Sequence, residues 1–398
     1  MTAAIMAARA GASVTILEHM ESLGKKILAT GNGKCNYTNE EQGVDKYYGK
    51  DPAFVLPVFE QFGFKETIAF FEELGIYPKV RNGYYYPQSE QAASVLEVLM
   101  MELTRLKVNM VYNCGIRKIK KEEDGFVFDT KTNTYYAKKC ILATGGKTLK
   151  SSGSDGSGFL YLGEFGHHVI DIVPGLVGLK GKQAFFGEIA GIRAEILLDL
   201  YIENEEIKQE KGELQLTSYG ISGIPVFQIS RLAAKAVSEG RKVHVILDFA
   251  PFMGEKDFGA YLYKRFKNQP GKNMKQALIG LFPEKIIRIF LQLAGIPALK
   301  AASDCLREDS SCLAEVIRHF RVDITDWNRF DSAQVTAGGA ATDEIYPKTM
   351  ESRKVPGLYF AGEMVDIDGI CGGYNLQWAW ASGAVAGMSA GKCKQEFI

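Results

Sequence analysis

The sequence predicts an α/β fold in which the two ends of the chain form one domain and the middle is inserted into it. Three observations support this prediction. A small-residue helix at 2–10 is followed by an apolar strand at 14–17, the second half of a β-α-β unit. A strand, a glycine-rich loop and another small-residue helix recur at 357–390. Between them, residues 172–320 become first β-rich and then helical.

The composition is that of a globular protein and argues against several classes of partner. The chain has 398 residues, enough for two or three domains of roughly 100–200 residues each. Lysine plus arginine equals aspartate plus glutamate, at 47 each, which argues against nucleic acid or an anionic membrane as the main partner. No window approaches the roughly 18 unbroken apolar residues of a membrane span. We expect a cytoplasmic protein with a small-molecule substrate, and the oligomeric state stays open.

The cysteines do not form a metal-binding pattern. None of the seven makes CxxC, and no cluster with histidine has zinc spacing. An odd, scattered set is typical of reduced thiols in the cytosol. We therefore expect no metal.

The first helix–strand segment predicts a contact to the ribose of a cofactor, but the phosphate-binding loop that accompanies such a contact is missing. Gly11 ends the helix, and Glu18 closes the strand where dinucleotide folds accept a hydrogen bond from a ribose hydroxyl. This signal alone is weak, because many strands end in Glu. The strand and GxGxxG loop that come before such a helix are absent from the sequence. We favour a true start codon upstream of Met1, with about a dozen further codons for this strand and loop. The alternative is that the chain departs from the fold at this loop.

A loop rich in glycine, lysine and asparagine follows at 23–36. Gly31 and Gly33 permit positive φ and close backbone approach, and Lys25, Lys26 and Lys34 add positive charge. The pattern indicates a loop that holds part of a phosphorylated cofactor. A mobile surface loop has the same composition.

The next stretch alternates helical and extended patterns. We expect helices at 51–62 and 65–74, an extended segment at 84–87, a helix capped by Ser89 that runs to about Leu106, and strands at 108–112, 115–120, 125–130, 134–137 and 139–144. The last strand ends in Gly145-Gly146, which can pass beneath a cofactor. The Gly/Ser loop at 151–158 is either a linker or an anion-facing start of a helix at 159–165.

The middle of the chain predicts a barrel or open sheet and a helical part. Strands are expected at 193–201, 205–208, 213–217 and 243–248, and helices at 224–237 and over 255–320. We expect three domains. Residues 1–165 and 332–398 form the domain of the two chain ends, residues 166–252 and 320–331 form a β-rich insert, and residues 253–319 form a helical subdomain.

The C-terminal segment predicts a binding site at the start of a helix. A strand runs into Gly362-Glu363, residues 368–377 form a glycine-rich loop, and a helix follows from Trp378 to Ala390. Such an arrangement favours an anion or dipole at the helix N-terminus.

Six blocks in this order resemble the YhiN-type bacterial FAD-dependent oxidoreductases, a flavoprotein family that includes aminoacetone oxidase. They are AARAGASVTILE (7–18), LGKKILATGNGKCNYTN (23–39), ILATGG (141–146), GSDGSG (153–158), QVTAGGAATDEI (334–345) and YFAGEMVDIDGICGGYNLQWAWASG (359–383). The resemblance covers essentially the whole chain. It implies a Rossmann-type FAD-binding domain built from both chain ends, a β-barrel-like insert and a helical subdomain.

The resemblance also implies contacts to FAD. Glu18 would bind the adenosine ribose, Ile116 would reach the adenine through its backbone, and Thr144-Gly145 would pass under the dinucleotide. Gly362-Glu363 would touch the ribityl-phosphate part. The loop from Thr30 to Asn36 would line the flavin and ribityl region. The other expected contacts to FAD are Lys25, Thr30, Gly31, Asn32, Gly33, Asn36, Gly373, Tyr374, Asn375, Leu376 and Gln377. Of these, residues 373–377 would present N–H groups to the pyrimidine end of the flavin, where the reduced form is negative.

A narrower resemblance, to bile-acid reductases of gut clostridia, implies reduction of C=C bonds conjugated to the 3-oxo group of a steroid. Reduced flavin would give hydride to an electron-poor carbon, and a nearby acid would protonate the adjacent position. Tyr374 and Cys371 are the candidate catalytic donors, with Tyr86 more distant, although packing alone also explains such residues. We expect His167 and His168 on the surface and nominate neither.

Two other functions stay open, namely an FAD-dependent amine oxidase that releases peroxide, and a non-catalytic flavin-binding or RNA-associated protein. The balanced charge counts against the last. No GxGxxG motif is present elsewhere in the sequence, so we expect no separate nicotinamide-binding domain. NAD(P)H is therefore a candidate electron donor only through transient binding in the substrate cleft. Oxygen is the other candidate redox partner.

Overall fold

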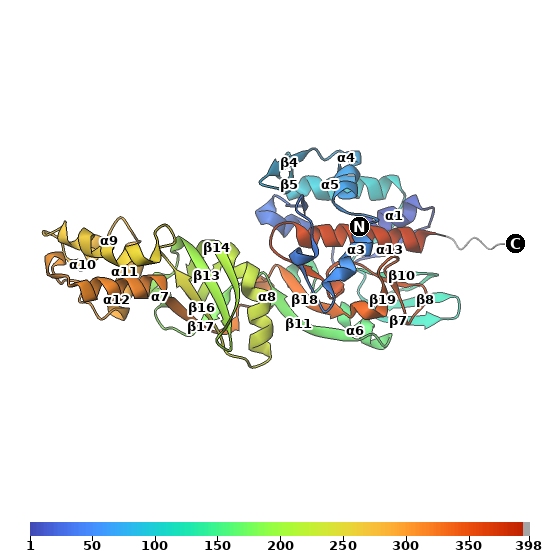
Figure 1. Ribbon diagram of the computed structural model, residues 1–398. Coiled ribbons are helices and arrows are strands. Elements are labelled where there is room, and N and C mark those ends of the chain that lie inside the picture. The colour runs from blue at the N-terminus through green and yellow to red at the C-terminus, as the bar shows by residue number, and fades with distance from the viewer. Residues whose placement is uncertain (393–398) are drawn as a thin grey trace. The chain divides into compact units, whose positions relative to one another are not determined.

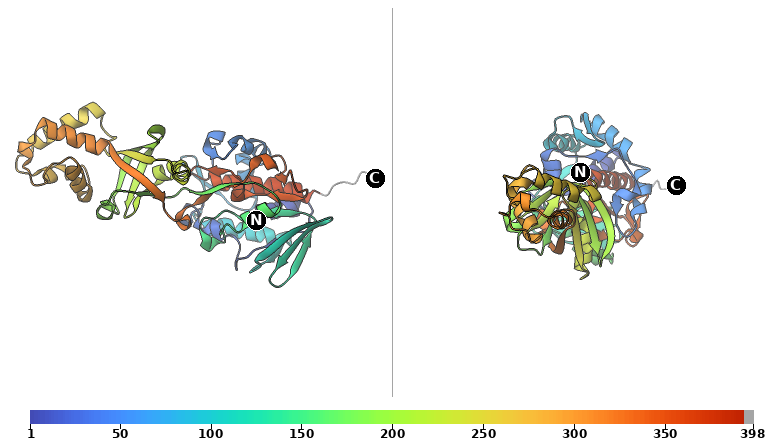
Figure 2. Two further views of the ribbon diagram at one scale, coloured as in Figure 1. Left: turned by 90° about the horizontal axis from the view of Figure 1, so that it is seen from below. Right: turned by 60° about the vertical axis from the view of Figure 1, so that its left-hand side comes forward.

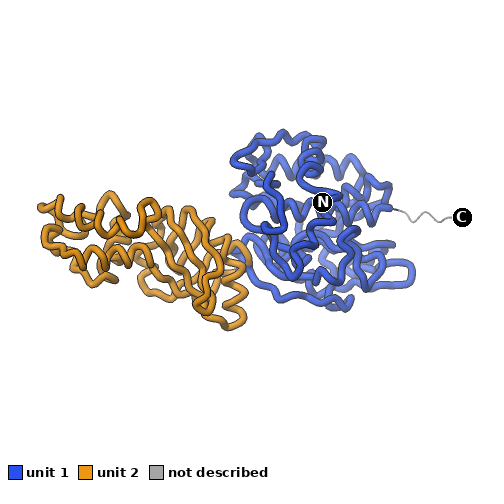
Figure 3. The backbone as a smooth tube through the Cα atoms, viewed as in Figure 1, with its two compact units in different colours: residues 1–174, 330–398 blue, residues 175–329 orange. Residues whose placement is uncertain are grey.

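The computed structural model describes residues 1–392, which divide into two compact units (Figures 1 and 3). Unit 1 contains residues 1–174 and the C-terminal segment from Phe330, and unit 2 contains residues 175–329. Cys393 lies outside the described residues. The finer three-part division expected from the sequence stays a prediction.

Two pairs of parallel strands form the frame of unit 1. β1 (Thr15–Leu17) pairs with β6 (Asn109–Val111), and β10 (Cys140–Leu142) pairs with β21 (Leu358–Phe360). β21 also pairs with β20 (Glu351–Ser352), which in turn pairs with β19 (Ile345–Tyr346). Because parallel strands run in one direction, the segments that follow β10 and β21 leave the same edge of their sheet, the edge where α/β proteins bind ligands.

Two helices rich in small residues pack closely together in unit 1. α1 (Thr2–Arg9) lies along α13 (Tyr374–Gly391), which is buried on nearly every side (Figure 1). A Cβ atom on Gly387 would lie 2.2 Å from the Ala3 carbonyl oxygen. The small residues of both helices are therefore required by their close approach.

Unit 1 contains further helices and strands. They are α2 (Lys25–Ala29), β2 (Thr38–Asn39), β3 (Tyr47–Tyr48), α3 (Leu56–Phe59), α4 (Phe64–Glu73), β4 (Pro78–Arg81), β5 (Tyr84–Pro87), α5 (Ala92–Arg105), β7 (Ile116–Glu122), β8 (Gly125–Thr130), β9 (Thr134–Ala137), α6 (Gly158–Glu164), β11 (Val169–Gly175), β18 (Val335–Ala340) and β22 (Asp368–Gly369). β2, β5 and β4 form one small sheet, and β7, β8 and β9 form another, which is teal in Figure 2. β11 pairs with β18, and β22 pairs with β3.

Unit 2 consists of a closed barrel and a group of helices. The barrel strands, in spatial order, are β12 (Leu179–Gly181), β15 (Gly220–Gly223), β14 (Glu205–Thr217), β13 (Arg193–Ile202), β16 (Val243–Asp248) and β17 (Phe320–Trp327). Alternate residues of β13 from Ile196 to Ile202 point into the buried interior. The helices are α7 (Phe186–Ile189), α8 (Ile224–Ser238), α9 (Glu255–Lys267), α10 (Met274–Leu278), α11 (Glu284–Leu293) and α12 (Arg307–Arg318). A barrel was one of the two predicted alternatives.

Three local predictions were wrong. The expected break between strands at 208 and 213 is absent, because β14 pairs with β13 across this stretch, with Gly212 opposite Ile196. Ser89 does not cap α5: the N-cap is Gln91, and the Ser89 hydroxyl lies 2.8 Å from that of Ser94. The last helix begins at Tyr374 rather than at Trp378. Within residues 1–392, no helix is long and apolar enough to cross a membrane.

Candidate cofactor and active site

The loop after α2 turns through several left-handed residues. Gly31, Asn32, Gly33 and Cys35 have φ values of 55°, 53°, 83° and 56°. The buried Cys35 side chain anchors the loop. A Cβ atom on Gly33 would meet nothing within 4 Å, so the backbone is open there. The predicted site residues Gly31, Asn32 and Gly33 therefore form a tight, accessible turn.

The start of α13 lies directly against this loop. Gly373, with φ of 92°, caps the helix. A Cβ atom on Gly373 would lie 2.9 Å from both Asn36 Oδ1 and the Thr38 carbonyl oxygen. The Thr38 hydroxyl donates a hydrogen bond of 2.6 Å to Gln377 Oε1. The structure thus joins two predicted segments that are more than 330 residues apart in the sequence.

The first turn of α13 presents its backbone donors at this junction. Tyr374, Asn375 and Leu376 are its first residues, and N–H groups in this position have no partner inside a helix. The Asn375 side chain bonds to both the N–H and the carbonyl of Gly369, at 2.8 and 2.7 Å, and so holds the preceding loop. The helix dipole adds partial positive charge at this end.

Two buried amide atoms at the junction fit a polar ligand. Asn36 Oδ1 and Gln377 Nε2 are buried and have no hydrogen-bond partner among residues 1–392. Leaving such an atom unpaired costs about 1–3 kcal/mol. One is an acceptor and the other a donor, and the pyrimidine ring of a flavin carries both N–H and carbonyl groups. The residues present therefore fit the flavin end of FAD.

A second group of contacts surrounds Glu363. Its carboxylate accepts hydrogen bonds from the Thr336 N–H at 2.7 Å and the Thr148 hydroxyl at 3.2 Å, and it forms an ion pair with Lys26. Gly362 donates its N–H to the Ser382 hydroxyl at 2.9 Å. The nominated Gly362-Glu363 pair is thus held rigidly at the edge of the sheet.

Three of these residues were not among the candidates predicted from the sequence. Thr148, Thr336 and Ser382 carry no local signal, because each acts on a segment distant in the chain. Lys26, which the sequence predicted to add positive charge to the cofactor loop, pairs with Glu363, whereas the nominated Lys25 forms an ion pair with Glu21. The other nominated residues here are less informative: Thr30 donates to the Ile27 carbonyl, Thr144 lies 3.6 Å from the Met364 sulfur, and Gly145 has φ of 75°.

The residues expected to bind adenosine lie near one another. Glu18 follows β1, and its carboxylate accepts the Met20 N–H at 2.9 Å. Its carbonyl accepts the N–H of Cys114 at 2.8 Å, two residues before Ile116. The Ile116 carbonyl accepts the Tyr161 hydroxyl at 2.8 Å. Glu18 and Ile116 are therefore brought to the same end of unit 1.

The candidate proton donors meet near the start of α13. Tyr374 is 4% exposed, and burial raises the pKa of its hydroxyl to about 12. Burial also raises the pKa of the half-buried Cys371 thiol. A Cβ atom on Gly372 would lie 3.0 Å from ring carbons of both Tyr374 and Tyr84. A Cβ atom on Gly31 would lie 3.9 Å from the ring of Tyr86. This cluster, which we call the tyrosine corner, consists of Tyr84, Tyr86, Cys371 and Tyr374.

The prediction for His167 was wrong, whereas His168 is exposed as expected. His167 is 4% exposed, and its Nε2 atom lies 2.8 Å from the Ser352 hydroxyl oxygen. The centroids of the His167 and Phe360 rings are 4.9 Å apart. It is buried because the chain turns after α6 and enters the sheet region at β11. Its Nδ1 lies 3.0 Å from the Glu344 carboxylate, so its role is structural.

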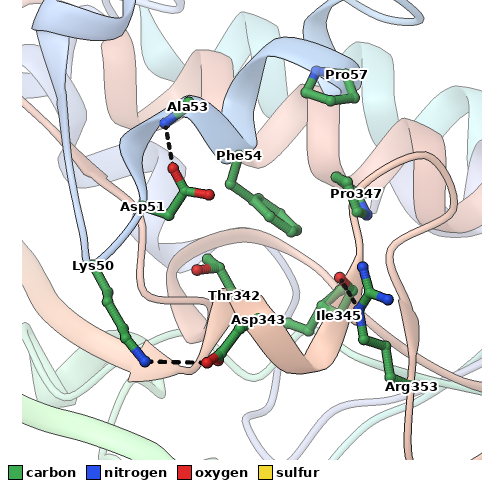
Figure 4. A pocket seen from close by; sticks show the side chains of 10 residues that line it. All are labelled: Lys50, Asp51, Ala53, Phe54, Pro57, Thr342, Asp343, Ile345, Pro347 and Arg353. Atoms are coloured by element: carbon green, nitrogen blue, oxygen red, sulfur yellow. Dashed lines mark hydrogen bonds and ion pairs between the residues drawn. The ribbon is translucent and has the colours of Figure 1, made fainter.

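A hollow of about 360 Å³ lies elsewhere in unit 1 and contains none of the nominated residues (Figure 4). Phe54 and Ile345 form its apolar wall, and Lys50 forms an ion pair of 3.1 Å with Asp343 at its rim (Figure 4). Phe54 also packs against Trp378, with ring centroids 6.2 Å apart. None of the residues that line the hollow belongs to the tyrosine corner.

Comparisons with known proteins agree with this architecture. Residues 1–389 match the family described as HI0933-like protein Rossmann domain. The 3-dehydro-bile acid Δ(4,6)-reductase of Clostridium scindens is 45% identical over 98% of this chain and 96% of its own length. The ribosomal RNA dihydrouridine synthase of Escherichia coli is 28% identical over 100% of this chain and 95% of its own, and that of Haemophilus influenzae is 28% identical over 96% and 93%.

These matches settle three predictions from the sequence. The recognised family, the Rossmann-type fold class with its barrel insert, and the assignment to the FAD-dependent oxidoreductases are confirmed. The individual site residues stay predictions. The chain belongs to the HI0933-like Rossmann family.

Proposed function

We propose that this protein reduces C=C bonds conjugated to a carbonyl group, and that its substrate is a 3-oxo steroid dienone of the bile-acid type. The 45% identity to the Clostridium scindens reductase supports the substrate class. The more distant relatives support the reaction class, because dihydrouridine differs from uridine by two hydrogens across a C=C bond conjugated to a carbonyl.

The observation that carries the proposal is the junction of the 30–36 loop, the start of α13 and the tyrosine corner. When bound, FAD supplies the two-electron redox chemistry. Asn36, Gln377 and the first N–H groups of α13 would hold and orient its pyrimidine end. The positive end of the helix dipole would stabilise negative charge there.

The tyrosine corner supplies the proton. A hydroxyl with a pKa of about 12 keeps its proton at neutral pH, so Tyr374 acts as an acid and not as a base. Cys371, whose thiol pKa is raised, also stays protonated and is the second donor. The buried ring of Tyr374, packed edge-on against Tyr47 at 5.9 Å, fixes the hydroxyl in place.

NAD(P)H is the proposed electron donor, bound transiently in the substrate cleft. Reduction of uridine in ribosomal RNA is the second candidate function, and the matches at 28% identity over nearly the whole chain favour it. Both candidate functions use the same junction and differ in the substrate that binds there, a steroid or a uridine of ribosomal RNA.

The test is anaerobic turnover of the FAD-loaded protein with NADH or NADPH and a 3-oxo-4,6-dienone. We expect a product heavier by two hydrogens for each reduced C=C bond. The Tyr374→Phe variant should keep its FAD and lose activity by about 10²–10⁴-fold, the usual contribution of a general acid. Tyr135→Phe, on the separate β7–β9 sheet, is the matched control and should keep full activity.

Two results would overturn the steroid proposal. One is conversion of uridine in ribosomal RNA without conversion of any dienone. The other is release of peroxide from an amine in air, again with the dienone unchanged. Full activity of Tyr374→Phe would remove Tyr374 from the mechanism.

A further inference from the structure

One face of the β4–β5 hairpin combines aromatic and cationic side chains. Lys79 lies directly opposite Tyr86, and Arg81 directly opposite Tyr84. Cross-strand partners and alternate residues share a face of a sheet, so these four side chains lie on the same face. The intervening Tyr85 turns to the opposite face.

The opposite face is packed into unit 1 and fixes the hairpin. The Tyr85 ring lies 5.1 Å from that of Phe64 and 6.4 Å from that of Tyr37. The Tyr37 N–H donates to the Tyr85 carbonyl at 2.9 Å. The orientation of the other face is therefore set by the core, and not by the charged residues themselves.

The tyrosines of the aromatic and cationic face belong to the tyrosine corner. Tyr84 lies beside Gly372, and Tyr86 lies beside Gly31. Lys79 and Arg81 extend the same face away from this corner. A ligand held by these cations would lie next to the proposed reaction site.

Three cations share one carboxylate here. Glu90, in the turn after β5, lies 2.8 Å from Lys79, 2.9 Å from Arg81 and 3.5 Å from Lys34. Lys34, Lys79 and Arg81 against Glu90 leave a net charge of +2 at neutral pH, and we call these four residues the cationic cluster. The Glu90 and Lys79 side chains are 24% and 29% exposed, so solvent screens the charge of this pair incompletely, whereas the Lys34 and Arg81 side chains are 48% and 51% exposed. Glu40 lies at Gly83, in the turn that joins Arg81 to Tyr84, so a further carboxylate flanks the Arg81 end of this face.

We propose that the cationic cluster binds a carboxylate at one end of the substrate, while the Tyr84 and Tyr86 rings contact the apolar body that joins this carboxylate to the reacting enone. The inference rests on the proposed function for the identity of the enone. It assigns the residues that recognise the acid group of such a substrate and the end of the molecule at which they do so. Lysine and arginine both form charge-assisted hydrogen bonds to carboxylates.

The test compares a dienone that carries a free carboxylate with its methyl ester. Binding of each to the oxidised, FAD-loaded protein is measured by isothermal titration calorimetry. We expect the acid to bind about tenfold more tightly than the ester, the effect of one net charge-assisted contact. The double variant K79Q/R81Q should bind the two compounds about equally.

A matched control uses another exposed pair on a strand. Lys120, on β7, forms an ion pair of 3.0 Å with Asp129 and lies outside the cationic cluster. K120Q should keep the preference for the acid. Raising the ionic strength should weaken binding of the acid to wild-type protein and leave binding of the ester unchanged.

The outcomes separate this inference from the proposed function. If the ester is reduced but the acid shows no binding preference, the reaction class stands and the cluster has no role in recognition. If the acid is preferred but neither compound is reduced, the cluster binds carboxylates and the reaction class is wrong. A preference that survives in K79Q/R81Q, or a rise in the KM for NADPH as the sole effect of that variant, overturns the inference.

Discussion

The junction between the 30–36 loop and α13 makes a strong prediction about Gly373. Replacement by alanine should weaken both folding of unit 1 and binding of FAD. An alanine at φ of 92° costs about 1–2 kcal/mol in backbone strain. Its Cβ atom would also lie 2.9 Å from Asn36 Oδ1 and from the Thr38 carbonyl carbon and oxygen, which adds about 1–3 kcal/mol.

Gly11 provides an unusually close control. It also has φ of 92°, but a Cβ atom there would meet nothing within 4 Å. Gly11→Ala therefore carries the strain without the clash. The difference between the two variants measures the clash at the junction, about 1–3 kcal/mol.

The assay is guanidinium unfolding followed by tryptophan fluorescence, together with titration of FAD. Two of the three tryptophans, Trp378 and Trp380, lie in α13 and report on unit 1. Gly373→Ala should unfold at lower denaturant than Gly11→Ala and bind FAD at least about tenfold more weakly, since 1.4 kcal/mol corresponds to tenfold. Equal midpoints and equal FAD affinities for the two variants would refute the reasoning.

Two further predictions concern buried and partly buried carboxylates. Glu102 is 6% exposed and bound by Arg9 at 2.6 Å and Arg105 at 2.7 Å, and these contacts lower its pKa from 4.5 to about 2. Because the folded-state pKa is lowered, the resulting stability, up to about 3 kcal/mol, is present above pH 4.5 and is lost as the pH falls towards 2. The free energy of unfolding of Glu102→Gln should thus fall below that of wild type at pH 7 and converge with it near pH 2, and a gap independent of pH would contradict this. Glu363→Gln removes the ion pair with Lys26, and we expect FAD to dissociate about tenfold more readily in equilibrium titrations; an unchanged Kd would exclude a role for this contact in cofactor binding.

The sequence predicted those parts of the fold that depend on local pattern. The small residues of α1 and α13 and the apolar strands β1, β10 and β21 are visible in a short window, because burial on one or more faces selects their side chains. The start of α13 was placed four residues too late, since the glycine-rich stretch before it has the composition of a loop. The structure shows that Gly373 ends the loop and that Tyr374 already belongs to the helix.

The candidate site was predicted as a set of segments but not as a set of contacts. The pairing of Thr38 with Gln377, and of Lys26 with Glu363, joins positions more than 330 residues apart. Such contacts depend on tertiary packing and leave no periodic signal in one sequence. The same limit explains His167, whose burial follows from strands far along the chain that receive it.

The cationic cluster was not predicted from the sequence, because it also depends on contacts between separate elements. No role was predicted for Lys79 or Arg81, and β4 was not expected as a strand. Only the cross-strand register with Tyr86 and Tyr84 places them beside the tyrosine corner. The balanced total charge of the chain conceals this local excess.

The most direct test of the central claim is a single turnover without oxygen. FAD-loaded protein is reduced chemically, freed of excess reductant and mixed with one equivalent of the dienone acid. We predict that the absorbance of oxidised flavin returns stoichiometrically and that the product has gained two hydrogens. Flavin that stays reduced in the presence of the dienone, and is reoxidised only when air is admitted, would contradict the account.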